Sequence, residues 1–125
     1  MGVKVSLILL ILASVALAAF GQVAMKKGMN AIGSLQIHDM LSTKLLSIAS
    51  QPFVVIGFML YIISAGIWLV VLSNADVSYA YPLVGLGYIV TAVLANLFFG
   101  ESLTMFKVLG ILMIMAGAFV VVSKF

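Results

Sequence analysis

The chain has 125 residues, of which 66% are hydrophobic and only 7% are charged. A soluble domain carries about 25% charged residues, so this composition excludes a water-exposed surface and predicts a single membrane domain, residues 1–125. The formal net charge is +3, but the basic residues are all lysines scattered along the chain, which does not indicate a nucleic-acid partner. There is no cysteine, so disulfides and thiolate metal sites are excluded.

Four stretches with hardly a charged residue are long enough to cross a bilayer, whose hydrocarbon core of about 30 Å needs roughly 20 helical residues. They predict an all-α fold, an integral membrane bundle of four transmembrane helices, with spans at residues 3–25, 53–72, 78–99 and 104–122. Residues 16–18 imitate the cleavage site of a signal peptide. The apolar run continues past them and three further spans follow, so we expect the first span to be retained.

The first span is expected to end at Lys26, Lys27 and Gly28, a cationic last turn followed by a glycine stop. One face of this span carries small residues and ends in the amide of Gln22. Two interpretations stay open. In the first, the face packs against another helix and the lysines anchor the span among the lipid head groups. In the second, Gln22 and Lys26 line a head-group site in which the Lys26 ammonium attracts a phosphate.

Residues 30–51 form the only long connection. Apolar residues recur there near helical spacing between polar ones, which predicts a short amphipathic helix lying in the membrane interface. Pro52 then suits the first turn of the second span. His38 and Asp39 lie in this connection, but two such residues make a poor metal site, so we expect no metal.

The third span holds the densest functional signal. Pro82 removes a donor from the helical hydrogen-bond ladder, and Gly85 and Gly87 loosen the same turn, so we expect a bend there. We interpret Pro82, Gly85 and Gly87 as a hinge beside a substrate path to which Tyr79 and Tyr81 contribute. A static kink flanked by interfacial tyrosines is the alternative.

Tight turns follow the second and third spans and force their neighbours to be antiparallel. After the second of these turns, Ser102 or Thr104 is expected to cap the fourth span, with Glu101 favourable near its positive end. Four lysines lie at the ends that face loops one and three and two at the opposite ends, which favours a cytoplasmic location for those loops. Insertion in both orientations stays open.

Two features of the last spans point to contacts between helices. Gly110 and Gly117 lie seven residues apart on one face and permit close backbone approach, which suits a dimer interface or, alternatively, packing within the bundle. Asn96 is a candidate for a hydrogen bond between helices. The chain has no phosphate-binding loop, catalytic triad pattern or carboxylate pair, so we expect neither an enzyme nor a cofactor.

Three short motifs occur in a fairly specific order along nearly the whole chain. Together they resemble the drug/metabolite transporter superfamily, in its four-helix branch of small multidrug resistance-like and EamA-like proteins. The motifs are Gly21-Gln22-Val23-Ala24-Met25-Lys26 in the first span, Ala80-Tyr81-Pro82-Leu83 through Gly87 in the third, and Gly100-Glu101-Ser102-Leu103 followed by the Gly110 and Gly117 repeat.

One departure from that branch decides the functional hypothesis. Its proton-coupled drug exporters carry a glutamate at the position of Ala18 and a tryptophan at that of Val84. The chain is more similar to the small flippase subunits for undecaprenyl-phosphate-linked aminoarabinose, which lack that glutamate. The resemblance implies a transporter or flippase that moves a lipid-linked sugar phosphate across the inner membrane. It assigns Lys26 and Lys27 to the phosphate, and Gln22, Tyr81 and Asn96 to the polar head group.

The resemblance also implies a homodimer, or a heterodimer with a similar subunit, since four helices alone leave little room for a path. Two rival functions stay open. One is an exporter of small molecules with a different coupling site, and the other is a non-transporting accessory subunit of a glycosyltransferase. A loosened backbone in the middle of the membrane argues against a pure scaffold.

Overall fold

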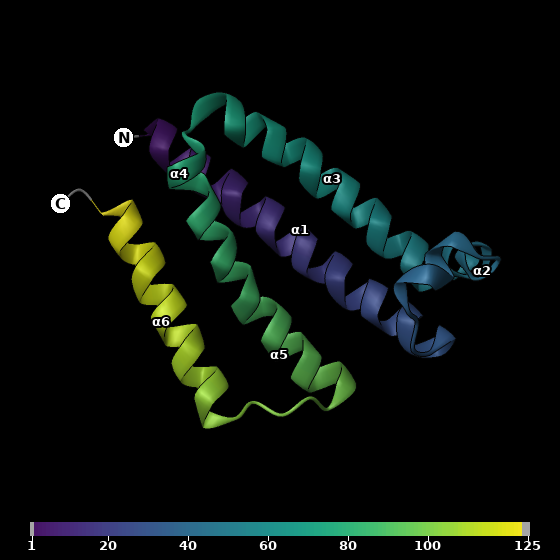
Figure 1. Ribbon diagram of the computed structural model, residues 1–125. Coiled ribbons are helices and arrows are strands. Elements are labelled where there is room, and N and C mark those ends of the chain that lie inside the picture. Colours follow the sequence, from purple (N-terminus) through teal and green to yellow (C-terminus); the bar gives the residue numbers. More distant parts are fainter. Residues whose placement is uncertain (1, 124–125) are drawn as a thin grey trace.

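The computed structural model describes residues 2–123, with side chains described from residue 6 onward. This part of the chain is mostly helical and has no strand, and four of its helical segments are long and apolar enough to cross a membrane (Figure 1). The segments are Ser6–Ile32, Pro52–Asn74, Val77–Phe99 and Met105–Val122. The predicted four-helix membrane bundle is therefore confirmed. Lys124, expected at a span end, lies outside the described residues, as does the side chain of Lys4.

Helix α1, Gly2–Ile32, is longer than the sequence suggested. The expected stop at Gly28 is wrong, because the helix continues to Ile32 and Gly33 follows it with a φ of 102°. Gly28 serves packing instead. It is buried, and a Cβ atom on it would lie 2.8 Å from the backbone nitrogen of Val54. A glycine needed for close approach between helices gives the same sequence signal as a glycine that ends one.

The connection that follows contains two short helices, the 3₁₀ helix η1 at Ile37–Leu41 and α2 at Lys44–Ser50. The Asp39 carboxylate accepts a 2.9 Å hydrogen bond from the Gln36 backbone N–H and lies 3.5 Å from the Lys44 ammonium. The Gln36 hydrogen bond and the positive charge of Lys44 lower the pKa of Asp39. In place of the one short helix that the sequence predicts, this connection therefore holds two short helices, and the Asp39 carboxylate contacts both the Gln36 N–H before η1 and Lys44 at the start of α2.

Helix α3, Pro52–Asn74, packs against α1 along most of its length (Figure 1). It begins as expected, with Pro52 in the first turn, while the side chain of Gln51 accepts a 2.8 Å hydrogen bond from the Phe53 N–H. Deep in the contact, the hydroxyls of Ser14 and Ser64 lie 3.0 Å apart, and each donates to the other residue's carbonyl, at 2.9 and 2.7 Å. Both serines are buried, so their hydroxyls are satisfied without water.

The third span is interrupted where the sequence predicted a bend. It consists of α4 at Val77–Ala80, the 3₁₀ segment η2 at Tyr81–Leu86 and α5 at Gly87–Phe99. Residues from all four spans meet around η2, which lies toward one end of the bundle (Figure 1). The fully or nearly buried members of this core are Ile11, Val15, Val71, Ala80, Leu83 and Ala118.

Helix α6, Met105–Val122, completes the bundle. Gly100 ends α5 with a φ of 67°, and the Thr104 hydroxyl then accepts a 3.2 Å hydrogen bond from the Lys107 N–H, so Thr104 rather than Ser102 is the cap. Helix α6 contacts mainly η2 and diverges from α5 toward its own start (Figure 1). Most of its side chains are exposed, so the described fold leaves it partly unpartnered.

Candidate functional site

A groove runs between α1 and α5, and Tyr61 of α3 also lines it. It consists of two cavities of about 300 and 270 Å³ that share the side chains of Gln22 and Thr91. The cavity nearer η2 is lined by Val15, Ala18, Ala19, Gln22, Tyr61, Val84, Gly87, Tyr88 and Thr91. The cavity nearer the end of α5 is lined by Gln22, Val23, Lys26, Thr91, Ala95, Phe99 and Glu101. The groove therefore has apolar walls, a polar middle and charged groups at one end.

The polar middle of the groove is held by hydrogen bonds. Gln22 donates to the Tyr61 hydroxyl at 3.2 Å, which ties α1 to α3 and orients the amide. Thr91 donates to the carbonyl of Gly87, one turn earlier on α5, at 3.0 Å. The lone pairs of the Thr91 hydroxyl and the amide oxygen of Gln22 then remain as acceptors for a ligand in the groove.

The two neighbouring lysines of α1 have different surroundings. Lys26 lines the charged end of the groove. The Lys27 ammonium lies 4.5 Å from the centre of the Phe53 ring, on the side of α1 that faces α3. The structure thus places Lys26 at the candidate site and engages Lys27 elsewhere.

Asn96 lies near the same end of α5, but its amide is used locally. It donates a 2.8 Å hydrogen bond to the carbonyl of Glu101 and closes the turn after α5. The Lys107 ammonium donates to the Ser102 carbonyl, also at 2.8 Å, and supports the same turn. Asn96 does not line either cavity of the groove.

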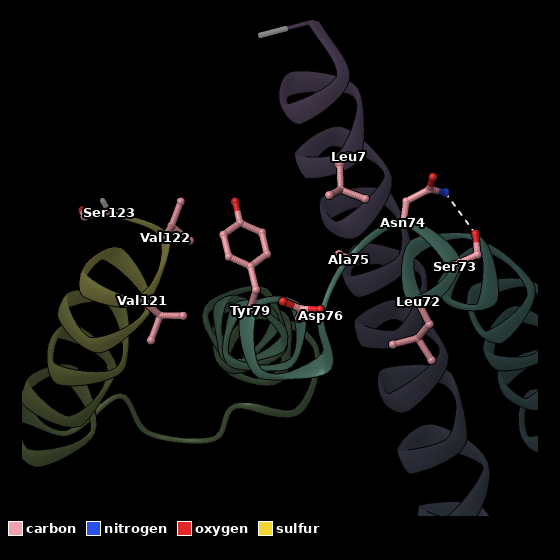
Figure 2. Close-up of a pocket in the computed structure, with 10 residues that line it drawn as sticks. All are labelled: Leu7, Leu72, Ser73, Asn74, Ala75, Asp76, Tyr79, Val121, Val122 and Ser123. Atoms are coloured by element: carbon pink, nitrogen blue, oxygen red, sulfur yellow. Dashed lines mark hydrogen bonds between the residues drawn. The ribbon is translucent and has the colours of Figure 1, made fainter. Parts of the chain in front are cut away.

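The predicted tyrosines lie toward the opposite end of the bundle. Tyr79 lines a separate opening of about 800 Å³ between the start of α1, the end of α3 and the end of α6, which Asp76 also lines (Figure 2). Tyr81 packs edge-on against Trp68, with ring centres 6.4 Å apart. Of the five substrate-contact residues predicted from sequence, the structure therefore brings together only Gln22 and Lys26.

The family model of the EamA-like transporter family matches residues 35–123. The chain belongs to the EamA-like transporter family. It is also similar to the probable 4-amino-4-deoxy-L-arabinose-phosphoundecaprenol flippase subunit ArnF of Proteus mirabilis (strain HI4320), at 31% identity over an alignment of 118 residues that covers 90% of this chain and 89% of the relative. No solved structure matches the chain.

Membership of the EamA-like family makes this protein a multi-pass membrane transporter. The resemblance to the drug/metabolite transporters and to flippase subunits is confirmed. In an EamA-like transporter, a groove that carries polar groups between apolar helices is the natural candidate for the substrate path.

Sequence reasoning missed four polar residues of the groove in this EamA-like transporter: Tyr61, Tyr88, Thr91 and Glu101. Thr91 follows Gly87 by four residues, so helical spacing places it on the same face as a glycine that the sequence predicts to be part of a hinge, and this signal was available. Sequence patterns assign Tyr61 no role in the site and predict Glu101 only as a favourable charge near a helix start. Their place in the groove depends on how α3 and the turn after α5 pack.

The hinge role of Pro82 stays a prediction, and it can be tested. Replacing Pro82 by alanine restores a backbone N–H and favours a continuous α-helix in place of η2. Since conformational steps often limit transport proteins and enzymes alike, we expect Pro82→Ala to slow translocation about tenfold without lowering the amount of protein in the membrane. Reconstituted vesicles give the rate and immunoblotting gives the abundance. A variant with normal turnover would mean that the interruption is static.

Proposed function

We propose that this EamA-like transporter moves a lipid-linked sugar phosphate across the membrane, as a flippase whose head-group path is the groove between α1 and α5. The single observation that carries the proposal is the combination of groups in that groove. Lys26 supplies a positive charge at one end, Gln22 and Thr91 supply acceptors within it, and its walls are apolar. An amphipathic phosphate ester presents the complementary set of groups.

The geometry supports a phosphate-bearing substrate over a cationic drug. Ala18 and Val84, the positions at which proton-coupled exporters carry a glutamate and a tryptophan, both line the groove. Helix α1 contains no carboxylate, so its wall of the groove has no group that exchanges a proton for a cation. The similarity to a relative named as a flippase subunit for an amino-sugar phosphoundecaprenol supports the same choice.

The path would be completed by a second subunit that covers α6. A Cβ atom placed on Gly110 or on Gly117 would have no neighbouring atom within 4 Å, so nothing in the described fold packs against these glycines. This free small-residue face supports the proposal of a homodimer, or a heterodimer with a similar subunit, in which Gly110 and Gly117 form the contact. The relative is itself named as a subunit, which agrees with an assembly of more than one chain.

Direct binding to the purified protein tests the proposed function. Native mass spectrometry would compare polyprenyl-phosphate sugars and bare polyprenyl phosphate with quaternary-ammonium cations of similar hydrophobicity. We expect the phosphate lipids to be retained at lower concentrations than the cations. Preferential retention of the cations would contradict the proposal and support an exporter with another coupling site.

A further inference from the structure

An apolar cavity of about 360 Å³ lies apart from the groove, between the connection after α1 and the start of α3. Helix α2 lies beside that part of α3 (Figure 1). The cavity is lined by Met40 of η1, by Leu45, Ile48 and Ala49 of α2, and by the first turns of α3, and every one of these lining side chains is apolar. None of them lines the groove between α1 and α5, so the cavity is separate from the proposed substrate path.

Hydrogen bonds hold the two short helices of the connection together over this cavity. The Ser42 hydroxyl donates to the Asp39 carbonyl at 2.7 Å and accepts a 3.2 Å hydrogen bond from the Lys44 N–H. The Asp39 carboxylate also lies 3.5 Å from the Lys44 ammonium. These contacts join the turn that carries Met40 to the helix that carries Leu45, so both side chains reach the same cavity. The charges of Asp39 and Lys44 offset each other outside it.

The cavity has a buried wall and an open side. Ile48 and Val54 are only 8% and 3% exposed and form the inner wall. Phe58 and Met59 are 55% and 61% exposed, so the cavity opens onto the outer surface of α3. That surface belongs to the membrane span Pro52–Asn74. The cavity is therefore continuous with the surface of the protein that the bilayer covers, and its opening faces hydrocarbon.

An empty cavity of this kind is unfavourable in a membrane. Water gains no hydrogen bonds between apolar walls, and walls that face a void lose their dispersion contacts. An apolar cavity of about 150 Å³ in another protein already binds benzene, so about 360 Å³ leaves room for a stretch of hydrocarbon chain. Met40 and Met59 line it with flexible, unbranched side chains that adapt to such a chain.

We propose that this cavity binds one acyl chain of a membrane phospholipid, and that the bound phospholipid holds η1 and α2 in place beside α3. The chain is selected by shape and dispersion contacts, because no polar side chain lines the cavity. The head group lies outside, near the paired charges of Asp39 and Lys44, so its own charge contributes little. The inference goes beyond the proposed function, because this lipid is a bound component of the protein and is not transported.

The experiment measures phospholipid retention by the purified full-length protein, stripped of lipid and titrated in native mass spectrometry. The probes are phosphatidylglycerol and phosphatidylethanolamine with the same long acyl chains, and a short-chain phosphatidylethanolamine. We expect equal retention of the two long-chain lipids, and retention about tenfold weaker for the short-chain lipid, which fills the cavity incompletely. A strong preference for phosphatidylglycerol, or equal retention of long and short chains, would overturn recognition through the acyl chain.

Matched variants locate the lipid. Ala49→Phe places a ring in the cavity and should weaken retention about tenfold. Ser47→Phe adds the same ring to the same helix at an exposed position that does not line the cavity, and should keep retention unchanged. Circular dichroism checks that both variants remain helical, and the chain-length comparison in the wild type needs no substitution. Undiminished retention in Ala49→Phe, or an equal loss in Ser47→Phe, would overturn the site.

Other occupants of the cavity give different results. If Ala49→Phe breaks up an oligomer and leaves phospholipid retention unchanged, a second copy of the chain covers the cavity and the proposal is overturned. Displacement of the phospholipid by polyprenyl phosphate would overturn it in favour of the transported lipid. Lys26→Ala alters the groove and should leave phospholipid retention as it is, so the proposed function and this lipid site fail separately.

Discussion

Replacing Gly57 by leucine is expected to lower the stability of the helix bundle by about 3 kcal/mol or more, the upper range for overpacking a close contact. A Cβ atom on Gly57 would lie 2.7 Å from the carbonyl oxygen of Gly21 and 2.9 Å from the backbone nitrogen of Met25. These atoms belong to the α1 backbone, which cannot move aside without separating the two helices. The hydrogen bond between Gln22 and Tyr61 lies one turn further along α3, so separating the two helices would break it as well.

A matched control exists on the same helix. A Cβ atom on Gly66 would have no neighbouring atom within 4 Å, so Gly66→Leu adds the same side chain to α3 without a clash. Its stability should stay within about 0.5 kcal/mol of the wild type, as is usual for exposed positions. Unfolding in mixed micelles, followed by circular dichroism, compares the two. Equal stability of both variants would show that α1 and α3 do not pack through Gly57.

The second large effect concerns the phosphate. Lys26→Ala is expected to weaken binding of a polyprenyl-phosphate sugar about ten- to hundredfold, because the lost hydrogen bonds to an ionised phosphate are worth about 1.5–3 kcal/mol in proteins. Binding is measured with the purified protein by titration in native mass spectrometry. Lys26 lines the groove, so the loss should appear for every phosphate lipid and not for uncharged ones.

Lys27→Ala is the control for this prediction. It removes the same charge from the adjacent residue, whose ammonium lies over the Phe53 ring on the α3 side. We expect less than about a threefold change in lipid affinity, since the general attraction of the membrane surface for basic residues is all that it alters. Equal losses in both variants would mean that the lysines act as a diffuse positive charge and that Lys26 holds no phosphate in the groove.

Much of the fold was predictable because the membrane imposes it. Backbone groups in hydrocarbon must bond within a helix, so each long apolar run has a single structural solution. Local signals also located the start of α3 at Pro52 and the interruption around Pro82. Gly28 was assigned the wrong role, since its residue type does not tell whether it ends a helix or allows another helix to approach.

The residues that form the site were harder to predict from the sequence than the fold. Adjacent helical residues differ by about 100° in direction, so only the packing of α1 decides that Lys26 and not Lys27 faces α5. Tyr61 joins Gln22 only through the close contact of α1 with α3. Glu101 lines the groove in a turn after α5 that is closed by the hydrogen bond from the Asn96 amide to the Glu101 carbonyl. The first two depend on contacts between helices and the third on the shape of one turn, and residue spacing encodes none of them.

The position of the bound head group decides whether the groove between α1 and α5 is the substrate path. A polyprenyl-phosphate sugar with a photoreactive group on the sugar would be crosslinked to the protein in bilayers, and the labelled residues identified by peptide mass spectrometry. We expect labels in α1 and α5 around Gln22 and Thr91, which disappear when unlabelled lipid is added in excess. Labels spread evenly over the exposed face of α6, or competition by quaternary-ammonium cations instead of by the lipid, would contradict a head-group path through this groove.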